Sequence, residues 1–335
     1  MNILGIETSC DETSAAVVND HTVLSNIIAT QAIHAEYGGV VPEFASRAHI
    51  RQLSPIINAA LDTAACTLAE IDGIAVTYGP GLAGSLLVGL GMAKGLALSL
   101  KKPFIGVNHI EGHILAAAAE NPALNTPFIA LVVSGGHTIL VHAEAPLSFH
   151  IIGQTIDDAA GEAFDKVAKI LDLGYPGGPL IEKAAHDGDG HSIDFPRALM
   201  DKDNLNFSFS GLKTSVLYWV QSRRRKNEMF SVADVAASFQ QAVVDVLVGK
   251  TFRALDQYHI KNLILAGGVA RNTLLRQSFE NRCAEEHIDL KIPAPILCTD
   301  NAGMIARAGH MRLSRGESSD FTLDVIPNLT LHDRA

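Results

Sequence analysis

Two histidines spaced four residues apart give the sequence its clearest chemical signal. The stretch NHIEGHIL, residues 108–115, carries His109 and His113. Four residues advance a helix by about 400°, so the two imidazoles would lie about 40° apart on one face and could share a cation. A metal requires a third ligand from elsewhere. The candidates are Asp300, in the stretch CTDNAG, and His137, in SGGHT.

Glu111 lies between these histidines, at a position that does not suit a peptidase. In the HExxH motif of zinc peptidases, the glutamate directly follows the first histidine and activates water on the metal. The order here is HxExH, which places Glu111 about 200° from His109 around a helix. We therefore expect Glu111 to be a surface charge or to bond a neighbouring segment. Two histidines and one carboxylate, with open positions, suit iron or zinc.

The segments expected to position these residues include two similar hairpins. Residues 2–18 and 127–143 each read as a strand, a turn rich in hydroxyl or glycine residues, and a second strand. Such turns can bring backbone N–H groups close to an anion. Two hairpins of one kind suggest a duplication into two lobes. Strands alternate with helices after each hairpin, which predicts an α/β fold.

The remaining elements follow from apolar runs and their periodicity. Asp300 is expected at a strand-to-helix edge, between the apolar run PAPIL and a final helix. The other expected elements are, in order, a polar segment through residue 51, a helix at 52–66, a strand at 71–79, a helix at 83–100, a strand at 103–109, a helical region at 157–250, a strand at 262–268, and helices from about 272 and 301.

Three glycine-rich stretches follow expected strands. GPGLAG at 79–84 matches the GxGxxG pattern of dinucleotide folds, but the next strand ends in Asn108 and His109 instead of an acidic residue, so we interpret it as a strand-to-helix turn. VSGGH at 133–137 and AGGVARN at 266–272 stand where strand ends and helix N-termini favour phosphate. Together they predict a nucleotide held between the lobes. No P-loop motif occurs in the sequence.

The composition favours a cytoplasmic protein of two lobes. The chain has 335 residues, 47% of them apolar, and exceeds the size at which single cores usually divide. Its four cysteines form no CxxC pair, which disfavours a disulfide framework and a thiolate zinc site. Glycine and lysine interrupt the longest apolar runs, and no signal peptide precedes the first strand, so we expect a soluble protein without a membrane segment.

The net charge of −10 disfavours a general nucleic-acid binder, which needs a basic surface. Residues 222–226, with the sequence SRRRK, are a local exception at the end of an expected amphipathic helix. They could bind a polyanion. They could also be only the solvated end of a helix.

Ten stretches along nearly the whole chain resemble one family, the bacterial tRNA threonylcarbamoyladenosine transferases of the TsaD type. They are IETSCDETS (6–14), VVPEFASRAH (40–49), GPGLAGSLLVG (79–89), NHIEGH (108–113), VSGGHT (133–138), GEAFDKVAK (161–169), YPGGP (175–179), FSFSGLKT (207–214), GGVARN (267–272) and TDNAGMIA (299–306). Phe44 and Gly303 depart from the family pattern, which has leucine and alanine there. Neither is an expected ligand position.

The resemblance implies an actin-like, Hsp70-like ATPase fold with two duplicated lobes and the active site in the cleft between them. The lobes would comprise residues 1–108 with about 301–335, and residues 109–300 with helical insertions. The implied reaction transfers threonylcarbamoyl from threonylcarbamoyl-AMP to the N6 amine of the adenosine 3′ of the anticodon (position 37), in tRNAs reading codons that begin with A. AMP would be released, and ATP or ADP could occupy the same cleft.

The resemblance also implies roles for individual residues. His109, His113 and Asp300 would bind one divalent metal that assists substrate positioning, Fe²⁺ or alternatively Zn²⁺. The residues that would hold the adenylate are Val132, Val133, Ser134, Gly135, Gly136, Asp165, Gly178, Glu182 and Asn272. The implied partners are tRNA, a catalytically silent paralogue of the TsaB type, a small P-loop ATPase of the TsaE type, and a separate synthase that makes threonylcarbamoyl-AMP.

The adenosine amine must lose a proton when it attacks, and Asp11 and Glu12 in the first hairpin turn are the candidate acceptors. The sequence does not decide between them, and Asp11 could instead only shape the turn. A tRNA substrate also needs phosphate contacts. The candidates for these are Arg223, Arg224, Arg225 and Lys226.

Two other functions remain open at this point. A metal-dependent endopeptidase would use the same metal ligands, but the position of Glu111 argues against it. A non-catalytic nucleotide-binding paralogue would not need a metal, and the presence of His109, His113 and Asp300 argues against it.

Overall fold

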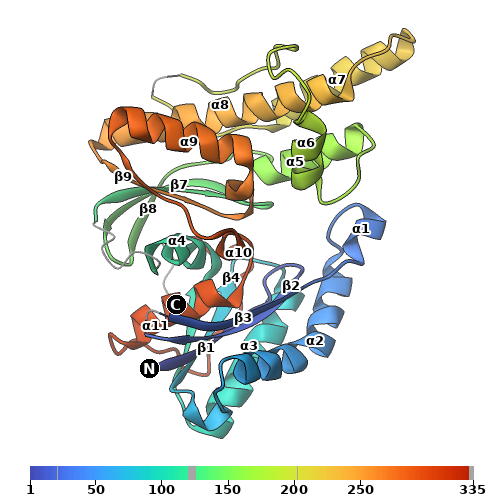
Figure 1. Cartoon of the computed structure of the whole chain (residues 1–335). Coiled ribbons are helices and arrows are strands. Elements are labelled where there is room, and N and C mark those ends of the chain that lie inside the picture. The colour runs from blue at the N-terminus through green and yellow to red at the C-terminus, as the bar shows by residue number, and fades with distance from the viewer. Residues whose placement is uncertain (21, 120–125, 202, 332–335) are drawn as a thin grey trace. The chain divides into compact units, whose positions relative to one another are not determined.

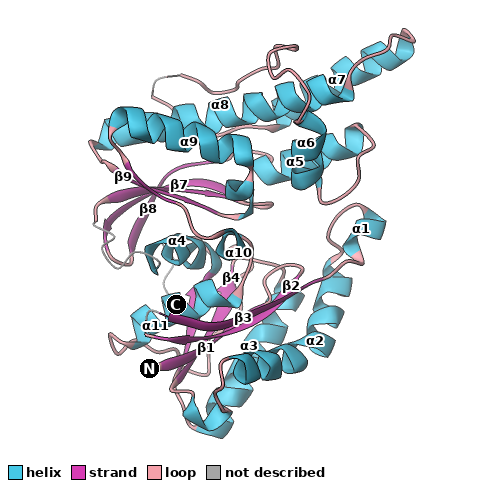
Figure 2. Ribbon diagram, viewed as in Figure 1, coloured by secondary structure: helices cyan, strands magenta, loops and turns pink. Residues whose placement is uncertain are grey.

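The computed structural model describes residues 1–20, 22–119, 126–201 and 203–331. The chain divides into two compact units, one from residues 1–124 and 293–335 and the other from residues 125–292 (Figure 1). Each unit is built around a five-stranded sheet, drawn in magenta in Figure 2. The fold is therefore mixed α/β, as the alternation of strands and helices in the sequence predicts.

The first unit contains a sheet in the order β3-β2-β1-β4-β5. Its strands are β1 (Asn2–Glu7), β2 (Glu12–Asn19), β3 (Thr22–Thr30), β4 (Gly73–Gly79) and β5 (Phe104–Asn108). β1 and β2 form an antiparallel hairpin, and β4 runs parallel to both β1 and β5. Every residue of β4 is buried, as expected for a parallel strand that is covered on both faces.

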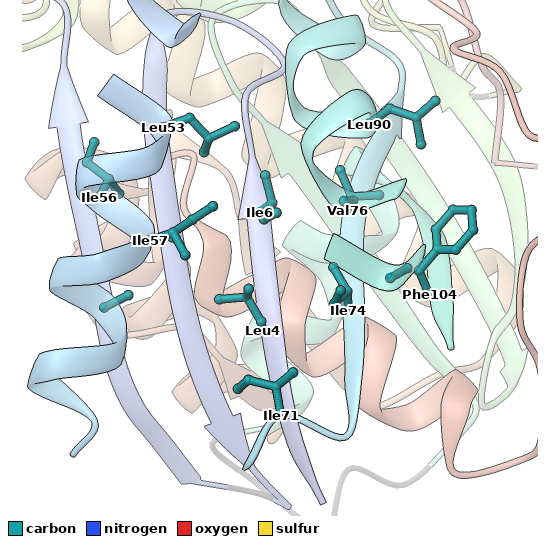
Figure 3. Packing of buried hydrophobic residues seen from close by; sticks show 14 of the residues in the cluster. Leu4, Ile6, Leu53, Ile56, Ile57, Ile71, Ile74, Val76, Leu90 and Phe104 are labelled. Carbon is teal, nitrogen blue, oxygen red and sulfur yellow. The ribbon is translucent and has the colours of Figure 1, made fainter. Parts of the chain in front are cut away.

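Helices cover both faces of this first sheet. The helical elements of the unit are α1 (His34–Tyr37), α2 (Pro42–Thr63), η1 (Leu68–Glu70), α3 (Ala83–Leu100), α4 (His109–Ala119), α10 (Pro295–Cys298) and α11 (Ala302–Leu313). On the face covered by α2 and α3, Leu4 and Ile6 of β1 share a core with Leu53 (Figure 3). On the α11 face, a Cβ at Gly5 would lie only 2.3 Å from the carbonyl oxygen of Ala302. Alternate residues of β1 therefore contact opposite layers.

The second unit repeats this topology. Its sheet has the order β10-β9-β6-β7-β8, so β6 to β10 occupy the places of β1 to β5. Its elements are β6 (Phe128–Val133), β7 (Thr138–Ala145), β8 (Ser148–Gln154), α5 (Ala160–Ile170), α6 (Gly177–Ala185), α7 (Ser210–Arg225), α8 (Val232–Tyr258), β9 (Asn262–Ala266), η2 (Gly268–Arg271), α9 (Thr273–Glu286) and β10 (Asp289–Lys291). The strand directions also match. The duplication inferred from the two hairpins is confirmed.

The unit boundaries differ from those expected at 108/109 and 300/301. In the structure, α4 and the segment 293–300 belong to the first unit. The physical reason is packing, because α4 lies against α11 and α10 lies against α4. The first boundary itself falls at residues 124 and 125, outside the described residues.

Three elements differ from the sequence predictions. The polar segment before residue 51 contains β3, and α2 begins at Pro42, ten residues before the predicted start at 52. β8 lies before the region predicted to be helical and was not expected. The run PAPIL ends in the short helix α10, so Asp300 lies between two helices and not at the end of a strand. β3 is a partly exposed edge strand, which explains its weak apolar signal.

Two helices, α3 and α8, are long and apolar enough to cross a membrane by length and composition alone. Two-thirds of the apolar window of α8 is buried, and α3 packs against β4 and α2. Core helices of large domains pass the same test, so these helices are weak evidence for a membrane span.

Candidate metal centre and glycine-rich turns

The two histidines are positioned by the start of α4. This helix begins directly after β5, where Oδ1 of Asn108 accepts a hydrogen bond from the backbone N–H of Ile110 at 2.9 Å. An asparagine that satisfies an N-terminal N–H in this way favours helix initiation. His109 and His113 therefore lie on the first turns of one helix, and both side chains are buried. Their rings are 4.7 Å apart at an interplanar angle of 84°.

Asp300 completes a group of three ligands. Its Oδ1 atom lies 3.4 Å from Nε2 of His109 and 3.2 Å from Nε2 of His113. One ligand atom from each residue falls within 4.8 Å of the others. The neighbouring Asn301 accepts a hydrogen bond from the N–H of Met304 at 3.0 Å and so begins α11 next to the carboxylate. The alternative third ligand, His137, lies in the second unit.

Glu7, at the end of β1, orients His109. Its Oε2 atom lies 3.0 Å from Nδ1 of His109 and also accepts a hydrogen bond from the hydroxyl of Thr77 at 2.6 Å. The N–H of Ser9 donates to Oε1 at 2.5 Å. A carboxylate on Nδ1 leaves Nε2 for a metal and raises the basicity of the ring. Sequence reasoning missed Glu7, although it stands inside the stretch IETSC that carries the family resemblance.

The charges of this group are arranged around His109. Burial alone would lower the pKa of His109, but the carboxylates of Asp300 and Glu7 on either side raise it well above its usual range. Burial would raise the pKa of Asp300, yet His109 holds it well below the ordinary value. The pKa of His113 is lowered, mainly by burial. Without a metal, the group therefore holds a protonated His109 between two carboxylates.

The donor set fits a divalent transition metal. Two imidazole nitrogens and one carboxylate oxygen that leave positions open are ligands suited to Fe²⁺ or Zn²⁺. The two histidines differ in the hydrogen bonding of their Nδ1 atoms. Nδ1 of His109 is bound to Glu7, whereas Nδ1 of His113 is buried with no hydrogen-bond partner among the described residues. A metal on Nε2 would displace the proton that His109 shares with Asp300.

Glu111 takes no part in this group. Its carboxylate is buried and accepts two hydrogen bonds from Arg312, at 2.9 Å from Nε and 2.7 Å from Nη2. The sequence predicted a surface charge or a bond to a neighbouring segment, and the structure shows the bond. The pair joins α4 to α11, the two helices that flank the metal ligands.

The first hairpin turn carries Asp11 and Glu12, both partly exposed. The pKa of Glu12 is raised to about 10 by burial, by the charge of Asp300 and by Asp11, to which it is hydrogen-bonded. Helix α2 contacts this turn through His49, whose Nε2 lies 3.0 Å from the carbonyl oxygen of Cys10. Burial lowers the pKa of His49, so the ring is neutral and donates from Nε2.

The second hairpin turn has a different character. Val132 and Val133 are buried at the end of β6, and Ser134 accepts a hydrogen bond from the N–H of His137 through its hydroxyl at 3.1 Å. Gly135 and Gly136 are exposed, and an added Cβ at either would meet nothing within 4 Å. The turn therefore offers backbone groups to a ligand without steric hindrance.

The other predicted adenylate contacts lie in the same unit as this turn. Oδ1 of Asp165 accepts from the N–H of Gly177 at 2.7 Å, which fixes the chain next to Gly178. Oε1 of Glu182 accepts from the N–H of Thr273 at 2.8 Å, linking α6 to α9. Gly267 lies so close to Val133 that a Cβ would be 2.4 Å from its carbonyl oxygen.

Asn272 has a structural role in addition to its predicted ligand contact. Its Oδ1 accepts from the N–H of Leu275 at 3.0 Å and caps α9, and its Nδ2 donates to Gln240 at 2.9 Å. The side chain is 7% exposed. A role in holding the adenylate would have to be shared with this cap.

The basic run 223–226 lies at the end of α7, as predicted. The helix ends at Arg225, and the cations in its last turn interact favourably with the helix dipole. Two of the four cations are in intramolecular ion pairs, Arg223 with Glu228 and Arg224 with Asp172.

Comparison with solved structures defines the class of fold. HypF, in its full-length, phosphate- and nucleotide-bound form, aligns with a TM-score of 0.63 and 14% identity over 95% of this chain and 47% of HypF. The activator of 2-hydroxyisocaproyl-CoA dehydratase from Clostridium difficile, with bound ADPNP, aligns with a TM-score of 0.56 and 11% identity over 96% of this chain and 99% of the activator. With the duplicated sheets, these likenesses place the chain in the actin-like ATPase fold class.

Sequence comparison is more specific. A sequence model of the TsaD family, described as tRNA N6-adenosine threonylcarbamoyltransferase, matches residues 22–307. Proteins of that name are 53% identical in Clostridium botulinum (strain Kyoto / Type A2), over 100% of this chain and 99% of the relative, and 52% identical in Clostridium beijerinckii, over 99% and 98%. The chain belongs to the TsaD family of transferases.

Proposed function

We propose that this protein transfers the threonylcarbamoyl group of threonylcarbamoyl-AMP to the N6 amine of adenosine 37 in tRNAs that read codons beginning with A. The observation that carries the proposal is the group of His109, His113 and Asp300, with Glu7 bound to the back of His109. Family membership supplies the reaction class. The metal group supplies the chemistry expected for an acyl-phosphate donor.

The reaction requires positioning more than covalent catalysis. The adenosine amine attacks the carbonyl carbon of the donor, a C–N bond forms, and the bond from that carbon to the phosphate oxygen breaks. AMP leaves with the electron pair of the broken bond, and the amine loses one proton. A cation held by His109, His113 and Asp300, Fe²⁺ or Zn²⁺, would act as a Lewis acid toward the developing negative charge.

We assign the adenylate portion of the donor to the glycine-rich turns of the second unit. The backbone N–H groups of Gly135 and Gly136 would hold phosphate, since both glycines are exposed, whereas the N–H of Ser134 donates to the carbonyl oxygen of His137 at 2.8 Å and shapes the turn. Asp165 would accept from a ribose hydroxyl. Gly178, Glu182 and Asn272 would line the same ligand, and ATP or ADP could use the same contacts.

The proton of the amine needs an acceptor, and the first turn supplies one. Glu12, with its pKa raised to about 10, is protonated at neutral pH, whereas Asp11 is its hydrogen-bond partner. We therefore favour Asp11 as the acceptor and Glu12 as the group that orients it. Asp11→Asn should abolish transfer with tRNA binding retained, while Glu12→Gln should retain part of the rate. Equal rates for Asp11→Asn and the unaltered enzyme would exclude this role.

Other components follow from the reaction. A separate synthase would supply threonylcarbamoyl-AMP, and a TsaB-type paralogue and a TsaE-type P-loop ATPase would act with this chain in the cytoplasm. A peptidase is disfavoured, because Glu111 is bound to Arg312 and does not reach the metal ligands. A silent paralogue is disfavoured because the ligand group is intact.

Reconstituted transfer of labelled threonine to tRNA tests the proposal. With all partners present, the unaltered chain should label tRNA, and both a chelator and His109→Ala should abolish labelling. His186→Ala is a matched control, because this histidine is 83% exposed in the second unit. Failure of the complete system to label tRNA would refute the proposed function.

A further inference from the structure

The outer face of α7 combines an aromatic ring with cations. The helix is anchored through one face, made by Leu212, Val216 and Val220, all of which are buried. A second row is made by Tyr218, Ser222 and Arg225, which helical spacing places away from the buried face, together with Lys226, which directly follows the end of the helix. The end of α7 extends away from the rest of the second unit (Figure 1). We call this second row the outer row of α7.

The four cations of the basic run 223–226 fall into two groups, according to whether they pair with an acidic residue. Arg223 is bound to Glu228 and lies over the ring of Trp219, 5.0 Å from its centre, and Arg224 is 2.7 Å from Asp172. Both cations are paired within their own unit, so a phosphate contact by either would compete with an acidic side chain.

The other two cations, Arg225 and Lys226, have no acidic partner among the described residues. Within the described part of the chain, Arg225 bonds only the uncharged Gln221, at 3.2 Å, and the side chain of Lys226 has no hydrogen-bond or ion-pair partner. The outer row thus keeps two positive charges that its own unit does not neutralise.

The residues of the outer row also line a pocket on the surface. The outer row lines an open pocket of about 340 Å³, with no acidic residue in its lining. Tyr218 is 64% exposed beside it. Small-ligand sites begin at about 300 Å³, so the pocket has room for one nucleotide unit.

We propose that the outer row of α7 binds RNA. Tyr218 stacks on an unpaired base, Arg225 and Lys226 contact phosphates, and the hydroxyl of Ser222 bonds a phosphate or ribose oxygen. A protein partner fits less well, because it would have to present an acidic group to a small pocket with one apolar ring. That the RNA is tRNA rests on the proposed function. The binding surface rests on the residues of α7.

Two double variants of equal charge test this site. The full-length protein is titrated with an unmodified transcript of a tRNA that reads a codon beginning with A, between about 50 and 200 mM salt. R225A/K226A should weaken binding about tenfold and reduce the slope of log affinity against log salt by about 2, because two phosphate contacts are lost. The matched control K101A/K102A removes the same charge from the first unit, where Lys101 is exposed and Lys102 lies 4.0 Å from Asp72, and should leave affinity and slope within about twofold of the unaltered protein.

Tyrosine variants test the stacking contact separately. Tyr218→Ala should weaken tRNA binding about tenfold and leave the salt slope unchanged. Tyr218→Phe should bind tRNA like the unaltered protein, since the ring and not the hydroxyl makes the contact. Circular dichroism shows whether α7 remains folded in each variant.

Four results would overturn the site: no tRNA binding by the unaltered protein, equal loss in both double variants, no loss in either, or loss of a copurifying protein with tRNA affinity unchanged. The binding assay contains no donor, so it decides the site even if threonylcarbamoyl transfer fails. Conversely, normal transfer with an unchanged KM for tRNA in R225A/K226A would reject the site and leave the proposed function intact.

Discussion

The two hairpin turns occupy the same place in two sheets of one topology, yet they carry opposite chemistry. β1 ends in Glu7 and β6 ends in Val133, and each of these residues pairs with the antiparallel strand that follows. Glu7 is a buried carboxylate that bonds a histidine. Beyond Val133, the turn presents two exposed glycines.

The difference shows how one duplicated backbone can carry two chemically different turns. The common topology determines where a strand ends and where a turn lies. Side chains at those positions then determine the sign of the charge that the turn attracts. Carboxylates and imidazoles in the first unit suit a cation, whereas side-chain-free backbone in the second suits an anion.

Removal of a metal ligand in the first unit should cause the largest loss of Zn²⁺ affinity. His109→Ala or Asp300→Ala should weaken Zn²⁺ binding by more than about 100-fold, since each deletes one of three donors, a larger loss than that of an outer partner. Competition with a chromophoric chelator measures the affinity. The exposed His186→Ala variant should bind normally. Unchanged affinity in His109→Ala would place the metal elsewhere.

Replacement of Glu7, the carboxylate at the first turn that has no counterpart at the second, should have the second-largest effect on Zn²⁺ affinity. Glu7→Gln keeps the shape of the side chain but removes its charge, so the affinity for Zn²⁺ should fall by about 10- to 100-fold. Glu43→Gln removes an exposed carboxylate on α2 and serves as the control. The role assigned to Glu7 would be wrong if the two variants bound Zn²⁺ equally well.

The contrast between the units was only partly visible in the sequence. His109 and His113 were predictable because their spacing is local, and Asp300 because its motif resembles the family. Glu7 was not predictable as their partner, because it lies 102 residues from His109 and is brought there by the register of β1 with β4 and β5.

Similar reasons explain the other differences. The unit boundaries were displaced because α4 belongs by packing with α11, a contact between distant parts of the sequence. β3 was missed because an edge strand lacks a strong apolar pattern. The cap made by Asn272 could have been recognised, since asparagine before a helical run is a known start signal.

The second turn can be tested by a pair of glycine variants. A Cβ at Gly161, in the first turn of α5, would lie 2.5 Å from the carbonyl oxygen of Ser134, so Gly161→Ala should lower the free energy of unfolding by about 1 to 3 kcal/mol and weaken ADP binding. Gly178→Ala meets nothing within 4 Å and should change stability by less than about 0.5 kcal/mol. Urea denaturation measures both. If the two variants were equally stable, the turn at Ser134 would be able to move away from the added methyl group without loss of stability, and the prediction would be wrong.

The pH dependence of metal binding sharpens the contrast further, because only the first unit should respond. The raised pKa of His109 means that a proton occupies the metal-free site above the ordinary value of 6.5. Displacement of one proton should make Zn²⁺ affinity rise about tenfold per pH unit, and this rise should continue above pH 6.5. The same shift stabilises the metal-free fold fully below the unfolded value of about 6.5, and this stability is lost as pH rises through the raised folded pKa.

Metal affinity and metal-free stability should therefore change in opposite directions with rising pH. Chelator competition and thermal unfolding between pH 6 and 8.5 measure the two. In Glu7→Gln both trends should weaken, because one of the two carboxylates that hold the proton on His109 is gone. ADP binding, assigned to the uncharged turn of the second unit, should not follow this pH profile. A Zn²⁺ affinity that levels off at pH 6.5 would mean that His109 titrates as an ordinary histidine.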